Sequence, residues 1–507
     1  MIDFGAWEKA LGEVVQVTRR TVLYGIGVSA ATAAITGCGG SDSTGALSTA
    51  VNPGGPTTAA NPQPTPAGPT TAASVTVDTT TAGTIASGFA GLSYEKGAMA
   101  EALFQASNTD LIGMFKGLGP SLLRIGGNSV DKTQWNATGA GRTSGQVAPA
   151  DIDALAGFVK AAGWTVLYGV NLATSTPAAA AAEVAHAVQS LGSSLYAIEI
   201  GNECDLYGDT GSYFANNWTL QDFEQLWGQF RSAILAAAPN VVITGPASAG
   251  HITTWTVPFG QAVGKQEIAL LTQHYYRGNG QSASSTDAEL ITPDTALVTD
   301  LSQLNTGATQ IGIPFRLTET NSFYNGGASG VSNSYASSLW VIDHLFNIAL
   351  GGGVGANFHG GGNGTGYTPI ANSDGVVVEA RPEYYGMKLF TLAGTGTLLG
   401  TTVSASSLNV TAYAVKSPTG GLNLIVVNKD STQNLNLTVN CGQTVGAATL
   451  MEMTGPALDA TTGVTIQGAA IGQDGVFTPQ SAYTLTASGT NVTCYVPALS
   501  AVLIAVT

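Results

Sequence analysis

The chain has 507 residues, of which 44% are hydrophobic, so it can bury a large core. Only 10% are charged, against roughly 25% in an average soluble domain, and 17 Lys and Arg against 32 Asp and Glu give a net charge of −15. So few cations cannot neutralise a row of phosphates, which argues against nucleic acid and densely sulfated polymers as main partners. We therefore expect a large, exported and mostly globular protein.

Residues 1–38 have the pattern of an export signal. A twin-arginine motif, Arg19-Arg20, precedes an apolar run of ~16 residues, which is too short for a membrane span of ~20. The run ends in Ile35-Thr36-Gly37-Cys38, which resembles the box where bacterial lipoproteins are cleaved and lipidated. This pattern predicts a periplasmic, outer-membrane or cell-surface lipoprotein that contacts a membrane only through this anchor. An ordinary signal peptide, with Cys38 incidental and the protein secreted, is the alternative.

Residues 39–74 are predicted to be a linker. No charged residue occurs from Ser43 to Val77, and six of the 20 prolines lie there. Such a stretch cannot bury enough surface to offset its ordering entropy, and proline keeps it extended. The segment is typical of a tether between an anchor and a folded body.

Residues 75–386 are predicted to form a (β/α)₈ barrel. Short apolar, β-branched runs alternate with segments that have helical patterns, as parallel strands buried on both faces do. The predicted strands are Gly88–Glu95, Ser121–Gly127, Thr165–Leu172, Leu195–Glu203, Val241–Ser248, Leu270–Tyr276, Phe315–Thr320 and Gly355–Gly361. The predicted helices are Ala148–Ala162, Pro177–Leu191, Leu220–Ala238 and Ser332–Leu350. Eight such units over ~270 residues favour a barrel over an open, doubly wound sheet, which is the alternative.

Residues 387–507 are predicted to form a C-terminal antiparallel β-sandwich, because short segments with period-two alternation are separated by Gly, Asn, Pro and Ser. Residues 75–84 are expected to add a strand to it. With Cys38 assigned to the anchor and Cys204 beside a candidate site residue, Cys441 and Cys494 are the predicted disulfide pair. No zinc-ligand spacing, phosphate-binding loop or dinucleotide fingerprint occurs, so we expect no metal and no cofactor.

Two carboxylates at the ends of predicted strands suggest chemistry on a sugar. Glu203 ends the fourth strand and Glu319 the seventh, and the carboxyl ends of barrel strands carry the active site. Cleaving a glycosidic bond needs a proton donor and a second carboxylate on opposite sides of the sugar. We therefore predict that Glu203 and Glu319 are catalytic. A strand-terminal Glu that only caps a helix or faces solvent is the structural alternative.

Four further side chains are expected near this pair. Alternation along the fourth strand places Glu199, Gly201 and Glu203 on one face. Asn202 is predicted to reach a ring hydroxyl, and Tyr275 to orient or stabilise Glu319. Arg124 is predicted to pair with Glu199 or to hold Glu319 ionised.

At these residues the sequence resembles glycoside hydrolase family 79, which contains bacterial β-glucuronidases and heparanase. The motifs that carry the resemblance are Leu123-Arg124-Ile125-Gly126-Gly127, Gly201-Asn202-Glu203, the segment from Glu319 to Gly327, Gly360–Asn363 and Arg381–Gly386. They cover the chain from about Gly88 to the C-terminus. The segment Glu-Thr-Asn-Ser-Phe-Tyr-Asn-Gly-Gly is specific, whereas Gly-Asn-Glu occurs in many barrel glycosidases.

The resemblance implies a retaining mechanism with Glu203 as acid/base and Glu319 as nucleophile. It also implies that Tyr324 and the backbone N–H groups of Gly326 and Gly327 bind a uronate carboxylate. The loop that contains Gly362 is implied to lie nearby, and Tyr367 to add a hydroxyl, although the inserted Gly364-Thr365-Gly366 departs from the family pattern. Glu95 and Asn128 match positions that bind sugar hydroxyls.

The expected substrate is a glycan or glycoside with terminal β-linked glucuronic acid, with or without a 4-O-methyl group. Heparanase needs cations along its cleft, but only Lys96, Lys132 and Arg277 follow the predicted strand ends, so the chain is more similar to the exo-acting bacterial enzymes. Another retaining barrel glycosidase, such as an arabinofuranosidase, is the same-class alternative. A non-hydrolytic sugar-binding lipoprotein is the alternative from another class. The sequence does not indicate an oligomeric state.

Overall fold

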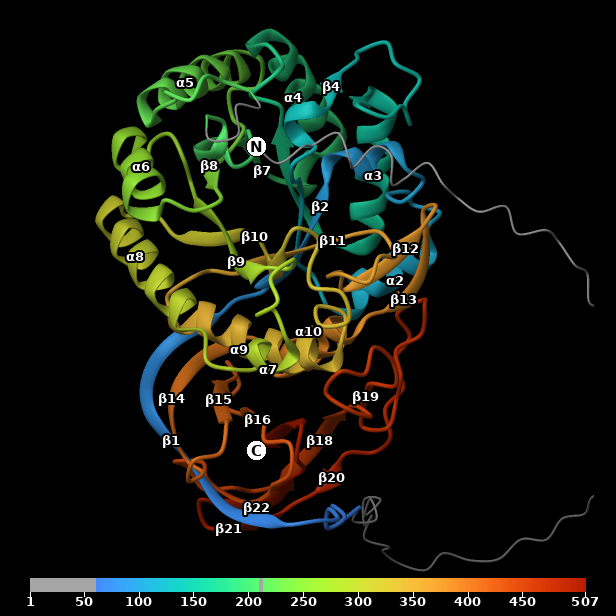
Figure 1. Ribbon diagram of the computed structural model, residues 1–507, viewed down its shortest axis with the longest axis vertical. Coiled ribbons are helices and arrows are strands. Elements are labelled where there is room, and N and C mark those ends of the chain that lie inside the picture. The colour runs from blue at the N-terminus through green and yellow to red at the C-terminus, as the bar shows by residue number, and fades with distance from the viewer. Residues whose placement is uncertain (1–60, 209–212) are drawn as a thin grey trace, which may run out of the picture. The chain divides into compact units, whose positions relative to one another are not determined.

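The computed structural model describes residues 61–208 and 213–507, and contains a closed barrel of eight parallel strands (Figure 1). All eight predicted strands are confirmed, and the ring order is β10-β11-β2-β3-β6-β7-β8-β9. The barrel strands are β2 (Ala90–Glu95), β3 (Leu122–Gly126), β6 (Thr165–Val170), β7 (Leu195–Ile200), β8 (Ile243–Ser248), β9 (Leu271–Asn279), β10 (Phe315–Tyr324) and β11 (Ala356–Gly360). The open-sheet alternative is therefore excluded.

Helices cover the outside of the barrel. The larger ones are α2 (Thr109–Gly117), α3 (Pro149–Ala162), α4 (Pro177–Leu191), α5 (Leu220–Ala237), α6 (Val257–Val263), α8 (Thr295–Ile311), α9 (Tyr335–Leu350) and α10 (Pro382–Leu392). Polar side chains cap the first turns of several helices. At α5 the Thr219 hydroxyl accepts from the Asp222 N–H, and at α8 the Asp294 carboxylate accepts from the Leu297 N–H. None of the helices in the described ranges is long and apolar enough to cross a membrane.

The C-terminal strands form one curled sheet of mixed direction (Figure 1). Its members are β14 (Gly396–Ser404), β15 (Val410–Lys416), β16 (Leu422–Asn428), β17 (Asn434–Asn440), β18 (Ala448–Thr454), β22 (Asn491–Val496) and β23 (Ser500–Val506), with the short strands β19 (Thr465–Ile466), β20 (Tyr483–Thr484) and β21 (Thr486–Ser488). Strand β1 (Thr70–Ile85) lies between β14 and β17, antiparallel to the first and parallel to the second. The predicted extra strand therefore exists and begins at Thr70, within the segment expected to be linker.

Helices α9 and α10 connect the barrel to this sheet. The Tyr335 hydroxyl on α9 donates to the backbone oxygens of Met453 and Leu499, and Asp343 pairs with Lys429 of the sheet. Apolar residues of the barrel and of the sheet belong to one continuous hydrophobic core. A second hydrophobic core lies inside the sheet.

The predicted disulfide is wrong: Cys441 and Cys494 are buried free thiols. Cys494 lies opposite Leu437 in the pairing of β17 with β22, and Cys441 follows Leu437 by four positions. Four residues along a strand span ~13 Å, whereas the Cα atoms of a disulfide lie about 4.4–6.8 Å apart. The export signal and Cys38 lie outside the described residues.

Candidate active site

The two predicted catalytic carboxylates meet at the carboxyl end of the barrel. Glu203 follows β7 and Glu319 lies within β10, three strands away around the ring. One carboxylate oxygen of Glu203 and one of Glu319 lie within 4.8 Å of each other. The structure therefore brings the two carboxyl groups together at the carboxyl end of the barrel.

A tight turn, rather than strand alternation, orients Glu203. Strand β7 ends at Ile200, and Glu203 has a left-handed backbone with φ of 50°, a conformation that costs about 1–3 kcal/mol and is frequent at functional sites. The turn needs Gly201, since a Cβ there would lie 2.5 Å from the sulfur of Cys204. The Glu203 N–H donates to the Ala247 oxygen (2.8 Å), and Oε1 of Glu203 lies 3.0 Å from Nδ1 of His274. Glu199, Gly201 and Glu203 are expected from the sequence to share one face of the strand. Only Glu199 lies within β7, and its side chain points into the barrel.

Glu319 is held as an anion. Arg124 Nη1 donates to its Oε2 and the Tyr276 hydroxyl to its Oε1, both at 2.7 Å, and His359 Nδ1 lies 3.7 Å away. Burial alone would raise the pKa of Glu319, but the charges of His359, His274 and Arg124 and the bond from Tyr276 hold its pKa well below the usual range. An ionised carboxylate at this position can attack an electrophilic carbon.

Arg124 is a fully buried hub inside the barrel. Besides Glu319 it binds Glu199 (Nε to Oε2, 2.6 Å) and Asn202 (Nη2 to Oδ1, 2.9 Å). Both predicted partners of Arg124 are therefore present at once. The bond from Nε to Glu199 fixes the orientation of the guanidinium group. In that orientation Nη1 of Arg124 points toward Glu319.

Asp131 is a buried residue of this site that sequence reasoning missed. Its Oδ1 accepts the N–H groups of Leu172 and Ala173, and its Oδ2 accepts the Asn202 N–H and the Tyr207 hydroxyl. These bonds tie the ends of β6 and β7 together just before Glu203. Asp131 lies in a short 3-10 helix (Val130–Lys132), five residues after β3, and nothing in its local sequence distinguishes it from a solvated surface residue.

Glu95, Asn128 and Asn202 lie beside the catalytic pair, as predicted. The Glu95 carboxylate accepts from the N–H groups of Asn128 and Ser129 and from the Ser129 hydroxyl, and lies 3.5 Å from His359 Nε2. Burial would raise the pKa of Glu95, but the bond and charge of His359 and the bond from Ser129 lower it. The exposed Asn128 side chain is 3.4 Å from that of Asn202, so both amides border the same space.

The predicted role of Tyr275 at Glu319 is wrong, and Tyr276 takes that position. The Tyr275 hydroxyl donates to both carboxylate oxygens of Asp294, at 2.9 and 2.8 Å, on the helix side of the barrel wall. Neighbouring residues of a strand point to opposite faces, so only one of the two tyrosines can face the barrel mouth. His274 faces that mouth, and Tyr276, two residues later, does so as well.

Gly326 and Gly327, whose N–H groups the resemblance implies bind a uronate carboxylate, follow β10. Both glycines have positive φ (79° and 89°), and in the described part of the chain their N–H groups have no hydrogen-bond partner. The Tyr367 N–H donates to the Gly326 oxygen (3.2 Å), which holds the inserted loop against this turn. Tyr324 is 45% exposed, so its hydroxyl can meet a ligand.

The expected site residue Gly362 and two of the cations that follow predicted strands already have other partners. The Gly362 N–H already donates to Asn372 Oδ1 (2.9 Å). Lys96 is buried and paired with Glu183, and Arg277 pairs with Glu289 and Asp294. Lys96 and Arg277 therefore stabilise the barrel wall through these ion pairs.

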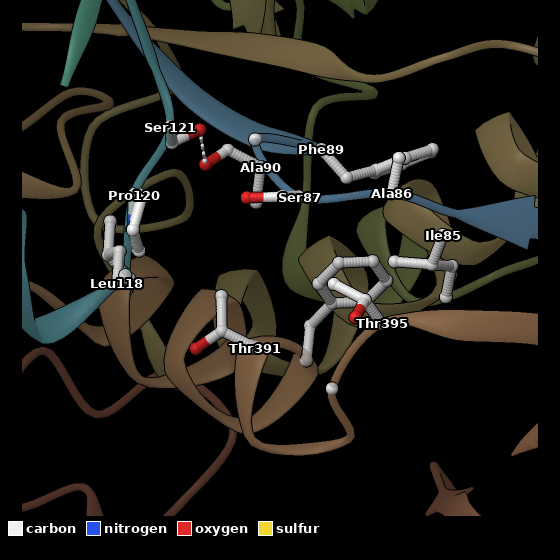
Figure 2. A pocket seen from close by; sticks show the side chains of 14 residues that line it. Ile85, Ala86, Ser87, Phe89, Ala90, Leu118, Pro120, Ser121, Thr391 and Thr395 are labelled. Carbon is white, nitrogen blue, oxygen red and sulfur yellow. Dashed lines mark hydrogen bonds between the residues drawn. The ribbon is translucent and has the colours of Figure 1, made fainter. Parts of the chain in front are cut away.

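A further hollow lies at the other end of the barrel (Figure 2). It has a volume of about 190 Å³ and is lined by residues before β2, before β3 and at the end of α10, including Phe89, Pro120 and Thr391. The Ser121 hydroxyl on its wall donates to the Ala90 oxygen (2.7 Å). No titratable side chain lines this hollow, so it offers no acid–base chemistry.

One atom each of Glu203, His274 and Glu319 lies close enough to the others for a metal ion to be held. Arg124 is already bonded to Glu319 at 2.7 Å, and the nearby Glu95 and Glu319 raise the pKa of His359, although burial lowers it. This positive charge beside Glu319 opposes a second cation. The cluster therefore fits a carboxylate pair with supporting donors better than a metal centre.

No family model matches the chain. A β-glucuronidase of Aspergillus niger is 30% identical in an alignment of 172 residues that covers 30% of this chain and 31% of that protein. The match thus spans about a third of the curated relative's length.

Solved structures share the fold over most of the chain. A 4-O-α-L-rhamnosyl-β-D-glucuronidase from Fusarium oxysporum 12S, in complex with Rha-GlcA, has a TM-score of 0.70 at 19% identity and covers 85% of this chain and 99% of that one. The α-L-arabinofuranosidase of Thermotoga maritima has a TM-score of 0.64 at 16% identity and covers 86% and 99%. The fold is that of barrel glycosidases that carry an additional β-sheet.

Proposed function

We propose that this chain is a retaining exo-β-glucuronidase. The observation that carries the proposal is the distance within 4.8 Å between one oxygen of Glu203 and one of Glu319. Retaining glycosidases have their two carboxyl groups about 5–5.5 Å apart, whereas inverting enzymes need about 6.5–9.5 Å to admit a water molecule. The spacing therefore favours direct attack by a carboxylate on the sugar.

In the first step, Glu319 attacks the anomeric carbon and Glu203 protonates the leaving oxygen, which gives a covalent glycosyl-enzyme. In the second step, Glu203 removes a proton from water, and that water displaces Glu319. Tyr276 and Arg124 hold Glu319 ionised before attack and steady it as a leaving group afterwards. His274, bonded to Glu203, orients the acid/base.

The N–H groups of Gly326 and Gly327, which have no partner among the residues that the structure describes, support a uronate as the substrate. A sugar carboxylate keeps its charge after water leaves, and backbone N–H groups in a glycine turn can satisfy it without a cation. Arg124 already forms ion pairs with Glu199 and Glu319. The N–H groups of the glycine turn and the Tyr324 hydroxyl are therefore the donors that we assign to the sugar carboxylate. The similarity of part of the chain to a β-glucuronidase agrees with this choice.

An arabinofuranosidase is the second candidate, because that activity is carried by a solved structure of the same fold. A panel of p-nitrophenyl glycosides separates the two. We expect hydrolysis of the β-glucuronide at least a hundredfold faster than of the β-glucoside or α-L-arabinofuranoside, and none with Glu319→Gln. A preference for the arabinofuranoside would refute the glucuronidase proposal, and ligand binding with no hydrolysis of any glycoside would favour the sugar-binding alternative.

We also propose that the protein is exported and anchored through a lipid on Cys38, as the N-terminal motif suggests. The full chain expressed in a bacterium should partition into detergent, and Cys38→Ala should release it to the aqueous phase. An unmodified Cys38 in the mature protein, shown by mass spectrometry, would leave only the secreted alternative.

A further inference from the structure

A polar cavity lies where the barrel meets the C-terminal sheet. Its walls come from the end of β9, from the helices α8 and α9, and from β15 and the residue that follows β16 (Figure 1). Its volume is about 170 Å³, far more than the about 10–15 Å³ that one water molecule needs. The described residues that line it include neither Glu203 nor Glu319. The cavity is therefore separate from the candidate active site.

His344 lines this cavity and has a ring nitrogen without a partner. The Thr320 hydroxyl donates to the Tyr275 oxygen (2.7 Å), so it accepts from Nε2 of His344 (2.9 Å). Burial and the charge of Arg277 lower the pKa of His344 to about 3, so the ring is neutral and carries one proton. That proton is on Nε2, which leaves the buried Nδ1 as an acceptor with no partner among the described residues.

Arg277 adds an unused donor to the same wall. Its two terminal nitrogens are already paired with Thr292, Glu289 and Asp294. Its Nε is buried and has no partner in the part of the chain that the structure describes. A buried polar group without a partner costs free energy. One hydroxyl group of an occupant can donate to His344 Nδ1 and accept from Arg277 Nε, and so satisfy both atoms.

The charges on the wall favour a neutral occupant. The described lining residues include two lysine or arginine side chains and two aspartates, and these form the pairs Arg277–Asp294 and Lys429–Asp343. The pairs cancel each other's charge within the cavity. A charged ligand would have to break one of them, whereas a neutral ligand leaves both intact.

Aromatic rings form part of the wall, and one side of the cavity reaches solvent. Trp340 stacks on His344 with ring centroids 4.7 Å apart, and Tyr413 stacks on Phe346 at 4.3 Å, so both rings are held in place. Val298 also lines the cavity and is 56% exposed, which gives a ligand a way in. Ligand sites typically combine apolar and aromatic walls with a few polar groups.

We propose that this cavity is a second binding site, for a small neutral molecule with several hydroxyl groups. Its volume is below the about 300–1,000 Å³ of pockets for drug-sized ligands, so we expect an occupant of about the size of a pentose sugar. One hydroxyl group bridges His344 and Arg277, and the carbon face of the ring lies against the aromatic wall. Binding here requires neither catalytic carboxylate, so the inference does not depend on the proposed glucuronidase activity.

The test uses D-xylose as the probe and tetrahydropyran, the same ring without hydroxyl groups, as its control. Isothermal titration calorimetry of the full chain should show saturable binding of D-xylose in the millimolar range, at least tenfold tighter than binding of tetrahydropyran. No saturable binding of D-xylose would mean that water alone fills the cavity and would overturn the inference. Equal affinity for the two rings would overturn it as well, because the hydroxyl contacts would then contribute nothing.

A variant pair distinguishes this cavity from the active site. Val298 is an exposed residue of the outer helix α8. Val298→Trp should weaken D-xylose binding at least tenfold, the matched Val298→Ala should change it less than twofold, and neither should alter glycoside hydrolysis. Undiminished binding by a folded Val298→Trp protein would contradict the assignment. If that variant does not fold, a crystal structure of the wild-type protein with D-xylose decides, since sugar density away from α8 and α9 would also contradict it.

Discussion

The hydroxyl of Tyr276 donates a 2.7 Å hydrogen bond to Glu319 from the neighbouring barrel strand. A hydrogen bond to a charged group is worth about 1.5–3 kcal/mol. Tyr276→Phe should therefore lower kcat about 10- to 100-fold and change KM little. Since this bond lowers the pKa of Glu319, the acid limb of the pH–rate profile should move to higher pH in the variant.

Tyr275→Phe is the matched control. It removes an equivalent hydroxyl from the adjacent residue, which is bonded to Asp294 at the start of α8 rather than to Glu319. The variant should lose about 1 kcal/mol of stability and keep nearly all activity with an unchanged pH profile. If Tyr275→Phe lost more activity than Tyr276→Phe, the assignment of the two side chains would be wrong.

The barrel could be predicted because its strands are short and apolar and are bounded by polar residues. This pattern is visible in the sequence itself, and the eight strands that it marks form the closed barrel. Helix α8 was not predicted, although Leu297, Leu301, Leu304 and Ala308 form a buried stripe. Its other positions include several Thr, with Ser, Asn and Gly, which are weaker helix formers than Ala or Leu. Packing of that stripe against the barrel overrides the weak local preference.

The proximity of Glu203 and Glu319 could be predicted from their places at the ends of predicted strands, but the contacts that support them could not. The choice between Tyr275 and Tyr276 depends on a single residue of register, which local sequence does not fix. The role of Asp131 depends on contacts with residues that follow β6 and β7. It can therefore be recognised only when the three-dimensional arrangement of these strands is known. The missing disulfide has the same origin, because the register of β17 with β22 separates Cys441 from Cys494.

Glu203→Ala should distinguish the two chemical steps. Without an acid, cleavage of natural glycosides should fall at least a thousandfold, within the range of about 10²–10⁴ for general acid–base catalysis. Aryl substrates with good leaving groups should still form the glycosyl-enzyme, and azide should restore turnover by giving a β-glucuronosyl azide. Rescue of Glu319→Ala rather than Glu203→Ala to this product would exchange the two roles.

Tyr324→Phe tests recognition of the carboxylate. Removing one charge-assisted bond should cost about 1.5–3 kcal/mol, hence about tenfold to a hundredfold in kcat/KM for p-nitrophenyl β-glucuronide. Turnover of the β-glucoside should be nearly unchanged, since it has no carboxylate. Equal losses on both sugars would mean that Tyr324 orients the ring.

Glu383 should make the stability of the fold depend on pH. It is fully buried, accepts from Asn321 Nδ2 (3.2 Å), and burial raises its pKa to about 8 despite that bond. Between its ordinary value of about 4.5 and about 8, the folded state keeps a proton that the unfolded state has lost. The free energy of unfolding should therefore fall with rising pH in this window, by up to roughly 1.4 kcal/mol per unit.

Glu383→Gln should remove this dependence, since the amide does not titrate. We expect the variant to have a higher Tm than wild type at pH 8 and a similar Tm near pH 4.5, measured by calorimetry. A Tm difference that is the same at both pH values would show that Glu383 does not carry the proton.

The stereochemistry of the first product tests the proposed mechanism most directly. Proton NMR of p-nitrophenyl β-glucuronide during hydrolysis, recorded before mutarotation, distinguishes the two anomers of free glucuronic acid. With Glu319 as nucleophile and Glu203 within 4.8 Å of it, the β-anomer should appear first. An initial α-anomer would contradict the double displacement, and no release of glucuronic acid at all would contradict the proposed activity itself.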